Sequence, residues 1–420
     1  MAANPTNKEN QALNVDILII GGGFVGNTLA AALSGTGLQT ALVDTQNLES
    51  AINAEFDGRS FAISLSNQKM LDGIGVWAGL SNHAGPILDI RISDGPSLMF
   101  LHYDHRETGD APMGYMIENH HLRRAHFERL TRADDVTVLA PDRVVSLTRN
   151  EAGVHGRLAS GVEVRAALAV GADGRASQTR SGAGIDVTQW SYRQSGIVCT
   201  VRHEHAHQCI AHERFLPAGP FAILPLRGDS PGAGNRSSLV WTESAELAPA
   251  MMALDDQAFV AELGRRFGDF LGRVEVAGPR YVFPLGLQFA SRMTDARLVL
   301  AGDAAHAMHP IAGQGLNMGL RDVAALAEVL VDARRLGQDI GAANVLARYA
   351  RWRRFDNTMM LAATDGLNRL FSNNLAPLRL ARDLGLATVN RMPPVKRLFM
   401  RHAMGLVGDL PRLLKGQPLV

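Results

Sequence analysis

Residues 297–322 read RLVLAGDAAHAMHPIAGQGLNMGLRD, and this stretch decides the fold. It opens with the apolar run LVLA, which is typical of a buried strand. Gly302 and Asp303 then end the strand and place one carboxylate just past its carboxyl end. Pro310 begins a glycine-rich loop, and from Leu316 onward apolar residues recur at helical spacing. We therefore expect a strand, an acidic turn, a glycine loop and a helix N-terminus, in that order.

This arrangement is suited to a ligand. Gly313 and Gly315 let the backbone of the loop approach a bound molecule closely. Leu316 and Asn317 follow at the helix N-terminus, whose positive dipole end favours an electron-rich group. The Asp303 carboxylate can accept hydrogen bonds from sugar hydroxyls. The alternative interpretation is an ordinary connection between a strand and a helix.

A second glycine motif lies near the N-terminus. Residues 15–20, VDILII, predict a central parallel strand, and Gly21, Gly23 and Gly26 supply G-x-G-x-x-G directly after it. A predicted helix follows, then a second strand that ends at Asp44. This is the strand–helix–strand context in which the motif binds a dinucleotide, with the acidic residue on a ribose. The first motif alone would permit NAD, whereas its pairing with the distant Gly302-Asp303 turn favours the longer FAD.

Composition sets the broad limits. The chain has 420 residues, is 46% hydrophobic and has a net charge of +1, so we expect two joined domains and no nucleic-acid partner. Residues 346–420 hold 13 Lys and Arg against 4 Asp. This basic region on an acidic body suggests an anionic membrane surface as partner, or merely solvated helix faces. Two cysteines indicate a reducing compartment, and no apolar run is long enough for a membrane span.

The motifs also carry a family resemblance. GDAAHAMHP resembles the second flavin fingerprint of the p-hydroxybenzoate hydroxylase-like flavoproteins. IAGQGLNMGLRD is similar to the narrower family of ubiquinone-biosynthesis hydroxylases. This resemblance implies an α/β fold, with a Rossmann-like FAD-binding domain, an inserted antiparallel β-sheet substrate domain and a C-terminal helical region.

The resemblance also implies further cofactor-binding residues. Arg59, in DGRSFAI, matches a segment whose arginine lies beside the flavin. His120, in ENHH, stands where the family commonly has an arginine near the pyrophosphate. Asp173 and Arg180, in ADGRASQTR, match the third fingerprint, which serves the pyrophosphate and the approach of the nicotinamide. Asp44 replaces the usual glutamate, and either carboxylate reaches a ribose diol. No metal site is expected, and the sequence names no catalytic residue.

The implied reaction is hydroxylation of the aromatic ring of a polyprenylated phenol, using FAD, NADH or NADPH, and O2 through a flavin hydroperoxide. Other ubiquinone-biosynthesis proteins are implied as partners, with a cytoplasmic location and peripheral attachment to the inner membrane. Two alternatives remain open. One is another flavoenzyme of the fold, such as an isoprenoid reductase or a hydroxylase of a different phenol. The other is a non-catalytic flavoprotein scaffold that binds quinone precursors.

The expected layout follows the resemblance and the local patterns. We expect a disordered tail at residues 1–14, an FAD-binding domain at 15–85, 104–184 and 291–345, a substrate sheet at 86–103 and 185–290, and a basic helical region at 346–420. Within this layout we predict one strand at 163–171 that joins the main sheet. We also predict an amphipathic basic helix at 396–407, whose character continues into 410–415.

Overall fold

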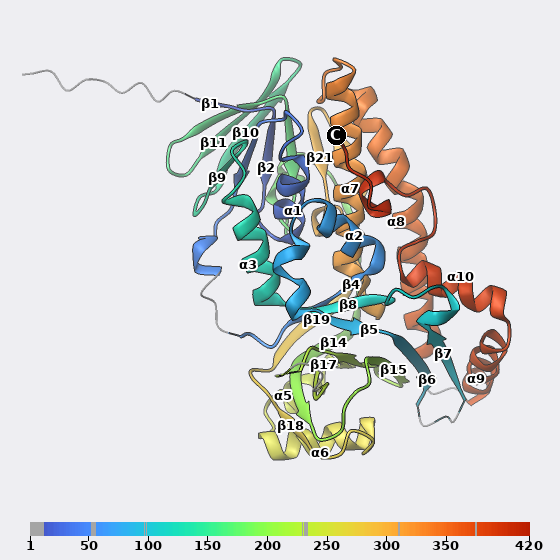
Figure 1. Ribbon diagram of the computed structural model, residues 1–420. Helices are drawn as coiled ribbons and strands as arrows, with labels where there is room; N and C mark the ends of the chain where they lie inside the picture. The colour runs from blue at the N-terminus through green and yellow to red at the C-terminus, as the bar shows by residue number, and fades with distance from the viewer. Residues whose placement is uncertain are drawn as a thin grey trace, which may run out of the picture.

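The fold is built around a six-stranded sheet, here described from a computed structural model of residues 12–51, 56–95, 97, 99–228, 230, 234–309, 311–373 and 376–420 (Figure 1). In spatial order its strands are β20 (Thr294–Asp295), β21 (Leu298–Leu300), β13 (Leu168–Gly171), β2 (Ile17–Ile20), β3 (Thr40–Val43) and β9 (Val136–Leu139). All neighbours pair in parallel except β20, which runs antiparallel to β21. The three strands expected around the glycine motifs, β2, β3 and β21, are all present.

The sheet is covered on both faces, which explains why its strands are apolar throughout. Because side chains alternate along a strand, Ile17 and Ile19 face the helices, whereas Leu18 and Ile20 face a smaller sheet. The helical layer includes α1 (Phe24–Leu33), whose Leu29 lies in the same core cluster as Ile17. The carboxyl ends of β2, β13 and β21 therefore meet at one edge, where all three glycine or Asp-Gly motifs begin.

The smaller sheet corrects two predictions. Its strands are β1 (Leu13–Asn14), β12 (Glu163–Ala166), β11 (Gly153–Leu158) and β10 (Val144–Asn150). Residues 13 and 14 are thus paired with β12 rather than part of a disordered tail, and residues 1–11 lie outside the described residues. The predicted single strand at 163–171 is wrong, because the chain leaves the small sheet after Ala166 and enters the main sheet at Leu168. An apolar run cannot show this change of partner.

A nine-stranded sheet forms the lower part of the molecule (Figure 1). Its strands in order are β22 (His306–Ala307), β19 (Tyr281–Ala290), β14 (Val187–His203), β17 (Arg236–Ser244), β16 (Gly219–Pro225), β15 (Ile210–Leu216), β6 (Asp89–Asp94) and β7 (Phe100–Asp104), and β18 (Val274–Val276) pairs with β14. The expectation of a wholly antiparallel sheet is wrong at one place, since β6 and β15 pair in parallel. These strands are far apart in the chain, so no hairpin turn forces them to run antiparallel.

Helices cover this sheet and connect the others. Phe221 and Trp241 are fully buried on one face of this sheet, where they pack in one cluster with residues of α6 (Asp256–Phe267). Three further strands, β4 (Ser60–Ser64), β8 (Gly114–Glu118) and β5 (Gly85–Ile87), form a separate sheet. The remaining helices are α2 (Leu65–Gly73), α3 (Asn119–Leu130), α4 (Gln178–Gly182), α5 (Ala248–Met252), α6 (Asp256–Phe267) and α7 (Gln314–Arg335).

The C-terminal region is helical, as predicted, and comprises α8 (Ala343–Phe371), α9 (Ala376–Asn390) and α10 (Pro393–Ala403). In residues 410–415, Leu413 and Leu414 are buried in the main core while Lys415 is exposed, so the apolar side of this segment faces the protein. That segment packs on the body of the protein, next to α2 and α7. Within the described residues, no helix is both long and apolar enough to cross a membrane.

Candidate cofactor site

The turn between β2 and α1 is closed by contacts that only glycine permits. Gly21 has a φ of 110°, in the region that favours glycine. A side chain at Gly26 would overlap the carbonyl oxygen of Gly21, and one at Gly22 would lie 2.8 Å from Asp44 Cβ. The Gly22 amide donates to Asp44 Oδ2 at 2.5 Å. The turn and the acidic residue at the end of β3 therefore form one rigid unit.

The N-terminus of α1 offers hydrogen-bond donors to a ligand. Its N-cap, Gly23, has no side chain to accept from the first helical amides. Asn27, one turn along, donates to the Gly22 carbonyl, while its own Oδ1 is buried without a partner among the described residues. Free amides together with the helix dipole are suited to a phosphate group.

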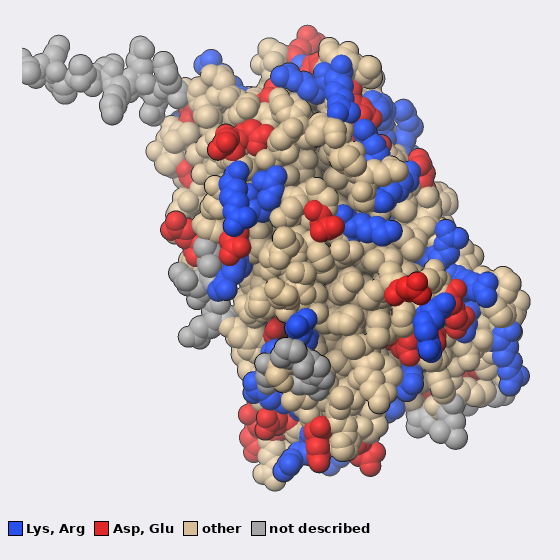
Figure 2. Space-filling model, in the orientation of Figure 1, with Lys and Arg blue, Asp and Glu red and all other residues tan. Residues whose placement is uncertain are grey.

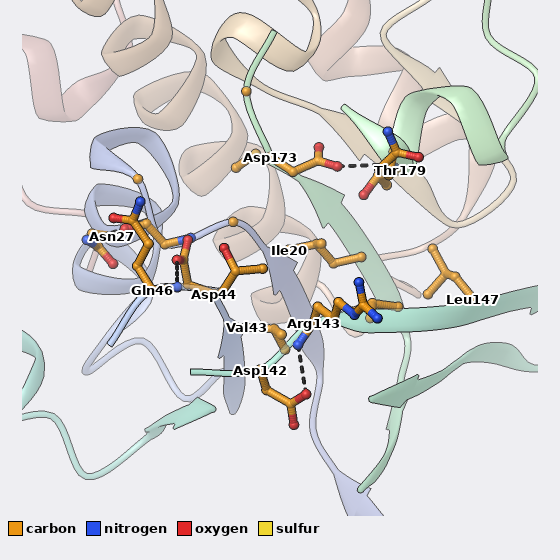
Figure 3. A pocket seen from close by; sticks show the side chains of 18 of the residues that line it. Ile20, Asn27, Val43, Asp44, Gln46, Asp142, Arg143, Leu147, Asp173 and Thr179 are labelled. Atoms are coloured by element: carbon orange, nitrogen blue, oxygen red, sulfur yellow. Dashed lines mark hydrogen bonds between the residues drawn. The ribbon is translucent and has the colours of Figure 1, made fainter. Parts of the chain in front are cut away.

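A cavity of about 1080 Å³ opens beside this turn (Figure 3). It reaches from the turn and from Asp44 to the loop after β13, where Asp173 lies. Arg123 of α3 and Arg143 before β10 bring positive charge to its wall. Its size and polar lining suit the adenosine and pyrophosphate portion of a dinucleotide. The wall is formed by residues 20–24, 27, 43–48, 123, 127, 142–147, 149, 172–174, 176, 178–179 and 182–183.

Asp173 shapes the loop on the opposite wall. Its Oδ1 accepts from the Ser177 hydroxyl at 2.5 Å. Its Oδ2 accepts from the Thr179 amide at 2.9 Å (Figure 3). Both bonds hold the Asp-Gly turn at the start of α4, which is too short to form without such support. Asp173 therefore lines the cavity and also orders its wall.

Arg180 links two of the predicted motifs. It is buried, and its guanidinium donates to the carbonyl oxygens of Ala304, at 2.9 Å, and Arg175, at 3.0 Å. Ala304 follows Gly302-Asp303 directly, so the third motif is tied to the second. Arg180 does not line the large cavity, and its bonds assign it a positioning role.

The Gly302-Asp303 turn packs against the first motif. Gly302 has a φ of 60°, and a side chain there would lie 2.7 Å from Val25 of α1. Gly319, on the first turns of α7, would meet the same Val25 side chain at 2.8 Å. Because Gly302 and Gly319 have no side chains, α7 and the acidic turn can approach α1 closely.

Asp303 is the second residue of this turn, and its side chain faces outward. Its side chain is exposed, yet the surrounding protein is close enough that desolvation raises the pKa of its carboxyl, with His306 and Arg175 lowering it in part. Both observations fit a side chain that faces a recess rather than open solvent. The residue therefore retains acceptors for a ligand beside the turn.

A buried ionic network supports the turn from behind. His306 Nε2 lies 2.6 Å from Asp322 Oδ2, and the same oxygen accepts from the Gly302 amide at 3.0 Å. Asp322 Oδ1 accepts from Arg353 of α8 at 2.7 Å. These bonds give His306 a structural role, because its ring nitrogen is held by the carboxylate that also supports the turn.

The glycine loop ends at Gly313, the N-cap of α7, with a φ of 62°. Asn317 anchors the loop, because its Nδ2 donates to the carbonyls of Ala62 and Gly313, while its Oδ1 accepts from Ser64 and Asn67. The polar atoms of the Asn317 side chain thus bond to the protein itself. Asn317 therefore affects a ligand only by fixing the position of this loop.

Two other predicted residues lie beside this loop. Gly315 and Leu316 occupy the first turn of α7 and are half-buried. No neighbour lies within 4 Å of a side chain built at Gly315, so space remains there. Pro310 lies outside the described residues.

His309 is fully buried, and neither of its ring nitrogens has a partner among the described residues. Burial lowers the pKa of His309 to about 4, so the imidazole is neutral at pH 7.

Arg59 and His120 lie apart from the large cavity. Arg59 pairs with Asp57 at 2.6 Å and lies over the Tyr281 ring, so its position beside a flavin stays a prediction. The His120 ring contacts Phe56 and His121. One turn further along α3, Arg123 points into the cavity instead. Arg123 is not among the residues predicted from the sequence, although its spacing of three from His120 places it near the same part of the helix surface.

The FAD-binding domain family matches residues 14–355, most of the chain. Over 407 residues the chain is 54% identical to "Ubiquinone hydroxylase UbiL" of Rhodospirillum rubrum, covering 96% of this chain and 93% of that one. It is also 35% identical to the Escherichia coli "3-demethoxyubiquinol 3-hydroxylase", covering 93% and 98%. The chain belongs to the ubiquinone-biosynthesis hydroxylase family. It is an FAD-dependent monooxygenase.

The fold comparison agrees with this assignment. The solved structure of p-nitrophenol 4-monooxygenase PnpA from Pseudomonas putida superposes with a TM-score of 0.77 at 18% identity, covering 94% of this chain and 99% of that one. At this identity the likeness shows the fold alone. The p-hydroxybenzoate hydroxylase-like fold predicted from the sequence is thereby confirmed.

The residues of this hydroxylase fit FAD at both of its ends. The cradle leaves no space for a side chain at Gly21, Gly22 or Gly26, and Asn27, whose Oδ1 has no partner among the described residues, lines the cavity beside it. These features, with Asp44 and Arg123, suit the adenosine and pyrophosphate end. Asp303 and the Gly313 loop suit the ribityl and ring end, and Arg180 joins the two halves.

Proposed function

We propose that this hydroxylase adds one hydroxyl group to the aromatic ring of a polyprenylated phenol in ubiquinone biosynthesis. The observation that carries the proposal is the 54% identity, over nearly the whole of both chains, to a ubiquinone hydroxylase. The three linked motifs support it, because they form one extended site for the cofactor. We further propose NADH or NADPH as reductant, other ubiquinone-biosynthesis proteins as partners, and a cytoplasmic enzyme that works at the inner membrane.

The overall reaction involves the phenol, NAD(P)H, O2 and FAD. NAD(P)H supplies two electrons, one oxygen atom of O2 becomes the new ring hydroxyl, and the other leaves as water. FAD, when bound, supplies the redox chemistry that couples the nicotinamide to O2. The chain itself must hold the cofactor at the Gly21–Gly26 cradle, place the glycine loop through Asn317, and keep water from the reacting ring.

The test uses the purified protein with bound flavin. NADH or NADPH is added in air with and without a short-tailed prenylphenol, and the organic extract is analysed by mass spectrometry. We expect a product heavier by one oxygen atom, formed only with both reductant and O2. Oxygen-independent reduction of the substrate would favour an isoprenoid reductase. A flavin that NAD(P)H does not reduce would favour the scaffold.

A further inference from the structure

Helices α9 and α10 form a helical hairpin that is firmly attached to the body. Arg382 of α9 pairs with Asp94 at the end of β6 at 2.7 Å, with both side chains buried. Lys396 of α10 pairs with Glu107 at 2.5 Å. Met400 packs in a small core below the hairpin. The basic residues that face the body are therefore neutralised by acidic partners from the body.

The outward side of the hairpin has a different composition. Among its side chains that the structure describes, the exposed large apolar ones are Leu384, Met392, Leu398 and Phe399, with exposed fractions of 54%, 46%, 56% and 46%. Isolated exposed apolar residues are common, but four on one short hairpin form a group that water solvates poorly. A helical hairpin with no function at its surface would not be expected to keep them.

Arginines accompany these apolar residues. Arg391, Arg397 and Arg401 are exposed, and no ion pair is described for any of them within the parts of the chain that the structure covers. No acidic residue occurs between positions 384 and 408. Lys and Arg side chains gather at the outer edge where Figure 1 places α9 and α10 (Figure 2). The charged side chains described on the outward side are thus all positive.

We propose that this outward side of α9 and α10 docks on the surface of a bilayer that contains anionic lipid. Apolar side chains would enter the interface between headgroups and acyl chains, while the arginines would contact phosphate groups. Lipid is favoured over a protein partner because the core of a protein interface is usually poor in charge. Here arginines stand directly beside the apolar residues, as Leu398 stands beside Arg397.

The position of the hairpin indicates what this docking would do for the enzyme. α9 packs along β7, an edge strand of the nine-stranded sheet, and along β6 beside it. A contact between the His102 amide and Asn390 also joins β7 to the hairpin. The docked surface would therefore hold the substrate sheet beside the bilayer. This role rests on the proposed function, since a polyprenylated phenol resides in the membrane, whereas the docking itself does not.

The experiment is co-sedimentation of the flavin-loaded full chain with vesicles. One set is pure phosphatidylcholine and the other includes about a third phosphatidylglycerol, each at low and high salt. We expect strong binding to the anionic vesicles only, weakened by salt. The double variants Leu398→Ser/Phe399→Ser and Arg397→Gln/Arg401→Gln should each reduce binding about tenfold or more, at roughly fivefold for each arginine lost.

A matched control keeps the outcome specific. Leu336→Ser changes an apolar residue that is 68% exposed at the end of α7, away from the hairpin, and should leave binding unchanged. Flavin absorbance, the melting temperature and NAD(P)H oxidation with a short-tailed phenol should be unchanged in every variant. Wild-type binding that is absent, or equal in the double variants, overturns the proposal. Self-association that depends on Leu398 and Phe399 would overturn it in favour of a protein interface.

The two proposals fail separately. Vesicle binding without hydroxylation of the short-tailed phenol would contradict the proposed function and leave the docking intact. Hydroxylation without vesicle binding would do the reverse.

Discussion

His306 Nε2 and Asp322 Oδ2 lie 2.6 Å apart beneath the Gly302-Asp303 turn, and both side chains are buried. The same carboxylate holds the Gly302 amide and the Arg353 guanidinium. One side chain on α7 thus connects the Gly302-Asp303 turn to the long helix α8. The turn keeps its shape because Asp322 satisfies a backbone amide and two cationic or neutral donors at once.

Asp322→Asn should destabilise the protein strongly. The amide keeps the size of the side chain but removes its charge, so Arg353 loses a partner while it remains buried. Removing one member of a buried ion pair costs about 3–5 kcal/mol. Urea unfolding of the flavin-free protein measures the loss. Asp356→Asn, which alters a more exposed partner of Arg353, is the control and should cost less. A loss below about 1 kcal/mol for Asp322→Asn would show that the network adds little.

Acid should weaken the fold through the same carboxylate. Burial raises the pKa of Asp322, but His306 and Arg353 lower it further, to about 2. An unfolded aspartate titrates near pH 3.9, so the stabilising contribution is complete above that pH and is lost as the pH falls toward about 2. The free energy of unfolding, measured between these limits, should fall more steeply in the wild type than in Asp322→Asn. Equal slopes would contradict this assignment.

Two glycines of the first motif should respond differently to alanine. At Gly26 a methyl group would overlap the Gly21 carbonyl, so Gly26→Ala should lower the melting temperature even without flavin. At Gly23 nothing lies within 4 Å of the added carbon, so the flavin-free melting temperature should stay constant. Gly23 lines the cavity, however, and Gly23→Ala should weaken FAD binding. Thermal melting and FAD titration of both variants distinguish folding from binding.

On α3, Arg123 rather than His120 should contribute to the affinity for FAD. Arg123 lines the cavity, so Arg123→Ala should weaken FAD binding by about tenfold, the effect of losing a charge-assisted contact of 1.5–3 kcal/mol at its lower end. His120→Ala should change FAD affinity little, since its ring contacts Phe56 and His121. Fluorescence titration of FAD gives both values. A larger effect at His120 would restore the expectation from the sequence.

The three motifs and their order could be read from neighbouring residues alone, because their chemistry is local. Gly21 and Gly302 adopt backbone conformations that favour glycine, and Asp44 and Asp173 follow apolar strands whose ends meet in any parallel sheet. Such requirements can be read from neighbouring residues. The cofactor and the family followed from them.

Tertiary structure decided which side chains face the site and which partner each segment takes. Arg123 points into the cavity while His120 does not, because the orientation of α3 is set by its packing and not by its own pattern. Residues 163–171 divide between two sheets, since an apolar run is equally compatible with either. Asp322 joins Gly302 to Arg353 across 20 and 31 positions of sequence. Contacts of this kind depend on the fold, because only the folded chain brings these residues together.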